Sequence, residues 1–130
     1  MGRRGQSLRP KERIHAAADF QRLLRRGVRV DGRFFVIVAG ENRRGYGRLG
    51  LAASRKVGTA VERSRAKRML REAFRRSKPE ASHWDLLLIA KKALVGRRLD
   101  DVERDYREGL ERLHRRRRAQ LSATTPPARG

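Results

Sequence analysis

The residues best suited to chemistry in this sequence are cations, and they are concentrated between positions 55 and 78. This segment holds only two acids, Glu62 and Glu72, so its net charge is +8 over 24 residues. Its ten cations are Arg55, Lys56, Arg63, Arg65, Lys67, Arg68, Arg71, Arg75, Arg76 and Lys78. Guanidinium groups pair with phosphate through two parallel hydrogen bonds, whereas the Lys ammonium acts as a point charge. The segment therefore indicates binding of a phosphate-rich partner.

The same segment has the pattern of an amphipathic helix over residues 60–76. Thr59 and Glu62 form a capping box, in which each residue satisfies a backbone amide of the other. An apolar stripe follows at helical spacing, made of Ala66, Met69, Leu70, Ala73 and Phe74. Opposite or beside that stripe lie Ser64, Arg65, Lys67, Arg68, Arg71 and Arg75. A merely solvated face normally alternates its charges, whereas like charges at this spacing repel, so we expect phosphates to relieve the repulsion.

The composition of the whole chain agrees with a nucleic acid as the partner. The 130 residues include 35 Lys and Arg against 14 Asp and Glu, which gives a net charge of +21. Without cysteine the chain can have no disulfide scaffold, thiolate catalysis or zinc finger, and it fits a cytoplasmic protein. The apolar runs of the sequence, such as residues 86–90, are far too short for a membrane span, and no signal peptide is visible.

A self-sufficient nuclease is the first alternative, and the residues argue against it. Acid–base cleavage would need paired histidines, but the three histidines are scattered at positions 15, 83 and 114. A two-metal site would need converging carboxylates. Asp100 and Asp101 look like cap residues of the last helix, while Glu103 and Asp105 point away from each other on it. We therefore expect no catalytic residue and no metal ligand in this chain.

The remaining patterns predict a mixed fold around this helix. A helix is expected at residues 16–26, and the stretch 28–39 contains an apolar run that indicates a buried strand. Further strands are expected at 46–53 and 84–91, and a last helix is expected to start at Asp100, with Val102, Tyr106, Leu110 and Leu113 on its inner face. The order helix, strands, helix, strand, helix predicts an α+β fold, a two-layer α/β sandwich.

The ends of the chain differ in composition from this predicted domain. Residues 1–12 are basic and rich in Gly and Arg, and residues 119–130 are rich in Ser, Thr and Pro. We expect both segments to be flexible or disordered tails. Residues 13–118 are then a single RNA-binding α/β domain.

The run from Ser54 to Phe74 resembles the signature of the bacterial ribonuclease P protein subunit. That family carries a serine followed by two basic residues, then Val/Ile-Gly-Asn-Ala-Val, Arg-Asn-Arg-x-Lys-Arg and Leu-Arg-Glu-Ala-Phe. Supporting matches occur at Asp19-Phe20, Arg33-x-Phe35, Arg48-x-Gly50 and Asp85. The resemblance covers about residues 8–118. Thr59 and Ser64 stand where the family usually has Asn, and Leu24 replaces a common aromatic of the substrate cleft.

The resemblance implies a subunit that works beside a catalytic RNA and helps it to remove the 5′ leader of precursor tRNA. It places catalysis and magnesium on the RNA, and it implies no obligate protein partner and no membrane. The RNA-binding residues would be Arg55, Lys56, Arg63, Ser64, Arg65, Lys67, Arg68, Arg71 and Arg75. A cleft between the sheet and the first helix would hold the single-stranded leader, with Phe20, Arg33 and Phe35 as its candidate residues. The family fold also implies a left-handed βαβ crossover, against the general rule.

A second alternative is a ribosomal-type or nucleoid protein that binds nucleic acid without a processing role. Composition alone is compatible with it, because such proteins are also strongly basic. The signature around the helix at 60–76 is what favours ribonuclease P.

Overall fold

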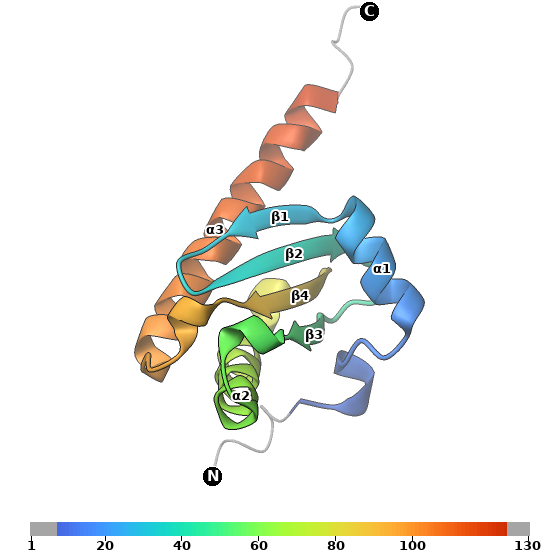
Figure 1. The fold of residues 1–130 in the computed structure, drawn as a ribbon. Coiled ribbons are helices and arrows are strands. Elements are labelled where there is room, and N and C mark those ends of the chain that lie inside the picture. The colour runs from blue at the N-terminus through green and yellow to red at the C-terminus, as the bar shows by residue number, and fades with distance from the viewer. Residues whose placement is uncertain (1–7, 125–130) are drawn as a thin grey trace, which may run out of the picture.

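A four-stranded mixed sheet forms the centre of the molecule, with α2 and α3 on one face and α1 on the other (Figure 1). The computed structural model describes residues 8–124. Its main elements are α1 (Ala17–Arg26), β1 (Val28–Asp31), β2 (Phe35–Glu41), β3 (Arg48–Ala52), α2 (Ala60–Arg76), β4 (Trp84–Ala90) and α3 (Leu99–Thr124). Short 3-10 helices occupy Pro10–Glu12, Arg55–Val57, Lys78–Ala81 and Lys92–Leu94. The α+β class is confirmed, and α1 adds a partial third layer to the two that we expected.

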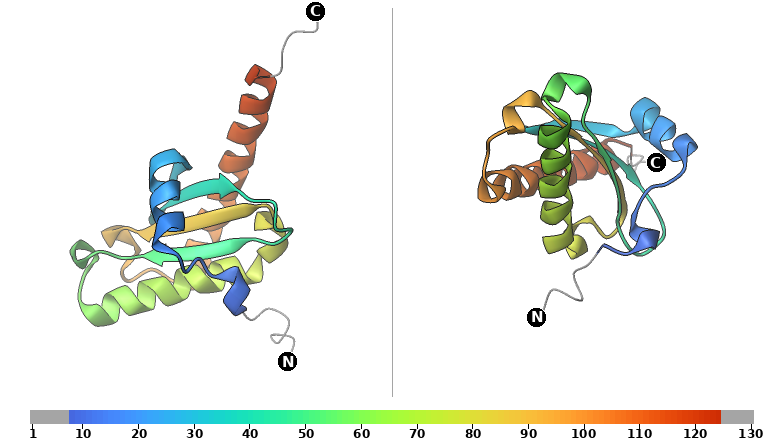
Figure 2. Two further views of the ribbon diagram at one scale, coloured as in Figure 1. Left: turned by 90° about the vertical axis from the view of Figure 1, so that its right-hand side faces the viewer. Right: turned by 60° about the horizontal axis from the view of Figure 1, so that its bottom comes forward.

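The strands lie in the order β1-β2-β4-β3. The β1–β2 and β2–β4 pairs are antiparallel, whereas β3 and β4 are parallel and are joined through α2. These three elements are the βαβ unit that the family resemblance implies, and the left-handed sense of its crossover stays a prediction. In Figure 2, α2 runs beneath the β3 edge of the sheet, while α3 passes behind β1.

The apolar run within the stretch 28–39 forms the buried strand β2 as expected, whereas β1, which precedes it in the same stretch, was not predicted. Gly32, Arg33 and Phe34 connect β1 and β2, and Gly32 N–H donates to the carbonyl of Phe35 at 3.0 Å. Asp105 of α3 fixes the turn, because its carboxylate accepts the backbone N–H groups of Arg33 (3.1 Å) and Phe34 (2.9 Å). This contact joins residues 72 positions apart, which local periodicity cannot show.

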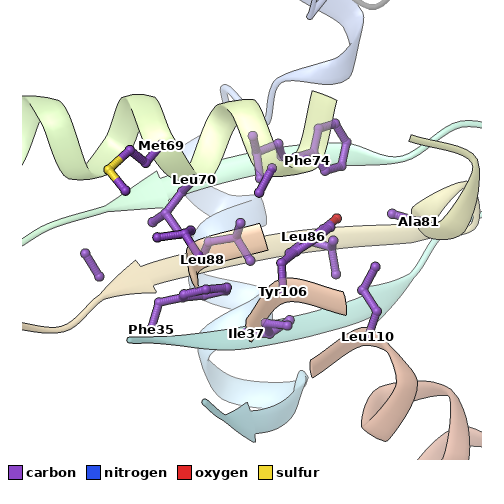
Figure 3. Packing of buried hydrophobic residues seen from close by; sticks show 14 of the residues in the cluster. Phe35, Ile37, Met69, Leu70, Phe74, Ala81, Leu86, Leu88, Tyr106 and Leu110 are labelled. Carbon is purple, nitrogen blue, oxygen red and sulfur yellow. The ribbon is translucent and has the colours of Figure 1, made fainter. Parts of the chain in front are cut away.

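The main core lies between the sheet and the pair α2 and α3 (Figure 3). Alternate residues of β2 point to opposite faces of the sheet: Phe35 and Ile37 enter this core, whereas Val36 and Val38 pack toward α1. The four residues predicted for the inner face of the last helix, Val102, Tyr106, Leu110 and Leu113, are all buried. The Tyr106 ring stacks on Phe35 with 6.5 Å between the ring centroids.

Both predicted tails contribute structure next to the domain. Pro10–Glu12 form a 3-10 helix, and the buried Glu12 accepts a hydrogen bond from Lys78 at 2.9 Å. At the other end α3 begins at Leu99, one residue before the expected start, and continues to Thr124. The helix therefore passes residue 118, where we expected a tail to begin. Residues 1–7 and 125–130 of the predicted tails lie outside the described residues.

Candidate nucleic-acid interface

The helix α2 is held to the sheet by the features that its sequence predicts. Thr59 Oγ1 accepts the N–H of Glu62 at 3.1 Å, and Glu62 Oε1 accepts the N–H of Thr59 at 2.9 Å, so the capping box is confirmed. The whole apolar stripe is buried, namely Ala66, Met69, Leu70, Ala73 and Phe74. Because this stripe fixes the rotation of the helix, the opposite residues must face outward.

The outward face of α2 presents cations that have no acidic partner. Ser64, Arg65 and Arg68 are exposed, and the cations Arg63, Lys67 and Arg71 are half-buried. Across residues 8–124, no carboxylate lies within ion-pair distance of the set Arg63, Arg65, Lys67, Arg68 and Arg71. We call these five residues the arginine ridge. Their mutual repulsion is not relieved within the described structure, which leaves the ridge able to bind an anion.

Arg75, also predicted to bind RNA, has a different environment from the arginine ridge. Glu72 pairs with Arg75 and also with Arg76, whose second partner is Glu103 at 3.0 Å. The hydrogen bond from Arg75 lowers the pKa of Glu72 although burial opposes the shift, and the same bond raises the pKa of Arg75. The C-terminal end of α2 is thus partly neutralised, and the unbalanced charge is at its N-terminal half and middle.

Contacts at the start of α2 orient two guanidinium groups of the ridge. Arg63 donates to the carbonyl of Gly58 at 2.8 Å, and Arg65 donates to the carbonyl of Arg97 at 3.1 Å. Arg55 and Lys56 are exposed in the 3-10 turn just before the helix. The free amides at a helix N-terminus add positive potential there. The cations before the helix and those on it therefore form one basic surface.

On the opposite face of the sheet, α1 packs through Leu23 and Phe20. Phe20 is partly buried, and its ring lies against Gly50 of β3, where any β-carbon would collide with it. Leu24, one turn further along α1, is 58% exposed. Phe20 is therefore a partly buried residue beside the sheet, at the position proposed for the leader cleft.

Phe35 does not belong to that cleft, and its assignment there was wrong. Its side chain is only 1% exposed and stacks on Tyr106 in the core beneath α3. Because side chains alternate along a strand, Phe35 points away from α1, and its neighbour Val36 faces α1 instead. The apolar run 34–39 did not reveal which of its two faces would lie against α1.

Arg33 is exposed, but it lies at the β1–β2 turn and on the α3 side of the sheet. Its backbone is tied to Asp105, and with Phe34, Arg97 and Arg104 it lines a small pocket there. The guanidinium of Arg97 stacks on the Phe34 ring, 5.1 Å from its centroid. Of the three predicted cleft residues, the structure therefore places only Phe20 between α1 and the sheet.

A buried ionic network joins α1 to the sheet, and no role was predicted for its members from the sequence. Arg48 makes two hydrogen bonds to Asp85, of 2.9 and 2.7 Å, and approaches Asp19 of α1 at 3.5 Å. Asn42 donates to Asp85 at 2.8 Å. Burial alone would raise the pKa of Asp85, but the hydrogen bonds from Arg48 and Asn42 outweigh burial and lower it. The sequence signal was present, since Asp19, Arg48 and Asp85 all belong to the family resemblance.

An open pocket of about 450 Å³ lies over this network, between α1 and the β2–β3 loop. Its rim carries the cations Arg22, Arg26, Arg43 and Arg44. The α1 face of the molecule thus combines a basic rim with the partly buried Phe20. A cationic track with a nearby ring face is what single-stranded RNA binding requires.

The acidic residues considered for catalysis are engaged elsewhere or separated. Asp105 binds the two backbone amides of the β1–β2 turn, and Glu103 pairs with Arg76. Among residues 8–124, no group of three or more His, Asp or Glu side chains is arranged to hold a metal ion. Over the same range, none of the helices has both the length and the apolar character that crossing a membrane requires.

The fold and its surfaces define a class of small, basic α+β proteins with an arginine-rich crossover helix. The family model described as Ribonuclease P matches residues 8–114. This chain therefore belongs to the ribonuclease P protein family, and the resemblance found in its sequence is confirmed.

Named relatives and solved structures agree with this assignment. The ribonuclease P protein component of Syntrophus aciditrophicus is 34% identical over 100 residues, which cover 76% of this chain and 84% of the relative. The ribonuclease P protein structure from Thermotoga maritima superposes with a TM-score of 0.70 at 30% identity, covering 78% of this chain and 96% of that one. The Staphylococcus aureus structure also gives 0.70, at 32% identity, with coverage of 77% and 93%.

Proposed function

We propose that this chain is the protein component of a ribonuclease P and that it binds the catalytic RNA through the arginine ridge of α2. The observation that supports this proposal most directly is the set of five cations without acidic partners within residues 8–124. Binding to RNA would pair these groups with phosphates and release the counterions condensed on the RNA. Arg55, Lys56 and Ser64 lie on the same surface and extend it.

The chemistry of cleavage would belong to the RNA and its magnesium ions. The protein would lower the repulsion between two polyanions and hold the substrate in register, which is a contribution of positioning. The engagement of Asp85 with Arg48, and of Asp105 with the β1–β2 turn, supports this division, because both buried carboxylates have structural roles. The chain would act in the cytoplasm, where precursor tRNA is made in bacteria.

The 5′ leader of precursor tRNA would bind on the α1 face of the sheet. Phe20 would stack on a base, and the basic rim of the pocket beside it would contact the leader phosphates. Phe20→Ala should then weaken binding of precursor tRNA to the assembled enzyme more than binding of mature tRNA. This ratio separates the stacking role from stability, since a fold defect lowers both affinities together. Equal losses would assign Phe20 to packing alone.

Reconstitution tests the proposed function itself. The purified chain is added to a bacterial ribonuclease P RNA at low magnesium, and removal of the 5′ leader is measured. We expect the chain to raise processing well above that of the RNA alone, because its cations replace part of the magnesium that screens the phosphates. A ribosomal-type or nucleoid protein would bind RNA without increasing correct processing, and that result would contradict the proposal.

A further inference from the structure

The last turns of α3 extend beyond both the sheet and the family match. The match to the family model ends at residue 114, whereas the helix continues to Thr124. Leu113 is the last described residue of α3 in the core, so about 16 Å of helix follows it. In Figures 1 and 2 this end of α3 stands clear of the sheet, on the side away from α2.

Four consecutive arginines, Arg115–Arg118, begin this extension, and we call them the α3 arm. Successive residues of a helix are rotated by about 100°, so the four side chains are distributed around the whole circumference. No acidic residue follows Glu111 in the sequence. The arm is therefore a short positively charged rod, at the end of the molecule opposite to the arginine ridge.

Contacts with the edge of the sheet hold one side of the arm in place. Arg116 donates to the backbone carbonyl of Arg29, Arg112 donates to that of Asp31 at 2.8 Å, and Arg117 pairs with Glu41. Since β1 is an edge strand, its outward carbonyls have no strand partner and accept these donors. Arg115 and Arg118 lie on the other side of the helix and are exposed to solvent.

Two ordinary explanations for such arginines do not account for this cluster. Cations stabilise a helix C-terminus through the macrodipole only within the last turn, whereas Arg118 lies six residues before Thr124. Internal charge pairing is also weak on the outer side. Arg115 and Glu111 are 3.8 Å apart with both side chains more than half exposed, and across residues 8–124 no carboxylate lies within ion-pair distance of Arg118.

We infer that the α3 arm is a second RNA-binding surface, which contacts the sugar–phosphate backbone of the catalytic RNA at a segment separate from the one on α2. α2 and α3 pack on the same face of the sheet, so one large RNA can reach both elements. The α1 face, where the leader would bind, points the opposite way. Two attachment points on one RNA raise the affinity because the second contact is intramolecular. This inference rests on the proposed function.

The experiment measures how the affinity of the full chain for ribonuclease P RNA depends on salt concentration. The test variant is Arg115→Gln with Arg118→Gln. Its matched control is Arg104→Gln with Arg107→Gln, which makes the same change in charge. Both arginines are exposed, and because they lie eleven residues earlier, they are on the same faces of α3. Arg115→Lys with Arg118→Lys keeps the charge, and Arg65→Gln with Arg68→Gln tests the arginine ridge.

We expect the slope of log K against log salt to fall by about 1.4–1.8 in the Gln variant of the arm. The Lys variant should keep the wild-type slope, and the control pair should change it little. Equal effects of the test and control pairs would mean that only net charge matters, and would overturn the inference. The inference would also be overturned if the Gln variant of the arm kept the wild-type slope while the variant of the arginine ridge lost part of it. That result would leave the proposed function in place.

Failure of the proposed function would give a different result in this experiment, because the variant of the arginine ridge would then keep the wild-type slope. A membrane partner would be recognised with vesicles that contain phosphatidylglycerol. If the Gln variant of the arm lost binding to these vesicles and kept its RNA slope, the arm would be a membrane contact and the inference would be wrong.

Discussion

Arg48 and Asp85 are register partners on the parallel strands β3 and β4, and two hydrogen bonds of 2.9 and 2.7 Å join their buried side chains. Arg48 of this pair also contacts Asp19 of α1, and Asp85 accepts a hydrogen bond from Asn42 of the β2–β3 loop. It therefore fixes the helix of the proposed leader site against the strands that flank the crossover. Removing one partner of a buried pair leaves a charge that is neither hydrated nor compensated.

Arg48→Met should for this reason lower the free energy of unfolding by about 3–5 kcal/mol. Urea denaturation measures the loss. Arg43→Met is a suitable control, since Arg43 is an exposed rim residue of the same pocket. A loss below about 1 kcal/mol for Arg48→Met would show that the pair does not hold the sheet and α1 together.

The lowered pKa of Asp85 predicts a loss of stability in acid. A carboxyl group whose pKa is lower in the folded state contributes stability above its unfolded pKa, near 3.9, and loses it as pH falls through the folded pKa. The unfolding free energy should therefore decline as the solution is acidified below about pH 4. Asp85→Asn should make that decline shallower, because the variant has no carboxyl group to protonate. An identical pH profile for the variant would contradict the assignment.

Tyr106 carries a buried hydroxyl group that finds no hydrogen-bond partner among the described residues. Its ring packs on Phe35 within the core. Tyr106→Phe keeps the ring and removes an unsatisfied polar group, so the free energy of unfolding should stay constant or rise by about 1 kcal/mol. Thermal and urea denaturation both measure this change in the free energy of unfolding. A loss of more than about 1 kcal/mol would mean that the hydroxyl group has a partner in solution.

Gly109 allows α3 to approach the sheet closely at Ile37. A β-carbon at this position would lie 2.7 Å from Ile37 Cδ1. Alanine is the better helix former by about 1 kcal/mol, but overpacking a core costs about 1–3 kcal/mol, so Gly109→Ala should destabilise the protein.

Ile37→Val removes the methyl group that Gly109→Ala would strike, so the double variant should be more stable than the sum of the single effects predicts. A double-mutant cycle in urea measures this coupling. Strict additivity would show that a side chain at position 109 does not meet the Ile37 methyl group, which would contradict the predicted close approach.

The bounds of α2 were predictable from the sequence because the features that define the helix are local, namely a capping box and an apolar stripe. The outward position of Arg68 follows from helix geometry alone, because this residue lies opposite the apolar stripe. The features that could not be predicted from the sequence depend on contacts between residues far apart in the chain. The β1–β2 turn relies on Asp105, and the burial of Phe35 beneath α3 depends on which face of β2 meets which helix.

The candidate site was predictable to a similar degree. The unbalanced charge of the arginine ridge was visible in composition, whereas the neutralisation of Arg75 by Glu72 required knowledge of side-chain orientation. The convergence of Asp19, Arg48 and Asp85 required the strand register, since the parallel β3–β4 pair is formed across a long crossover.

The central claim is that the unpaired cations of α2 hold the RNA, and a comparison along this one helix tests it most directly. Arg65→Ala with Arg68→Ala removes two cations without acidic partners, and Arg75→Ala with Arg76→Ala removes two that Glu72 already neutralises in part. The measurement is the salt dependence of binding to ribonuclease P RNA. We expect the slope to fall by about 1.4–1.8 for the first pair and by clearly less for the second. An unchanged slope for Arg65 and Arg68, or a larger change for Arg75 and Arg76, would contradict the claim.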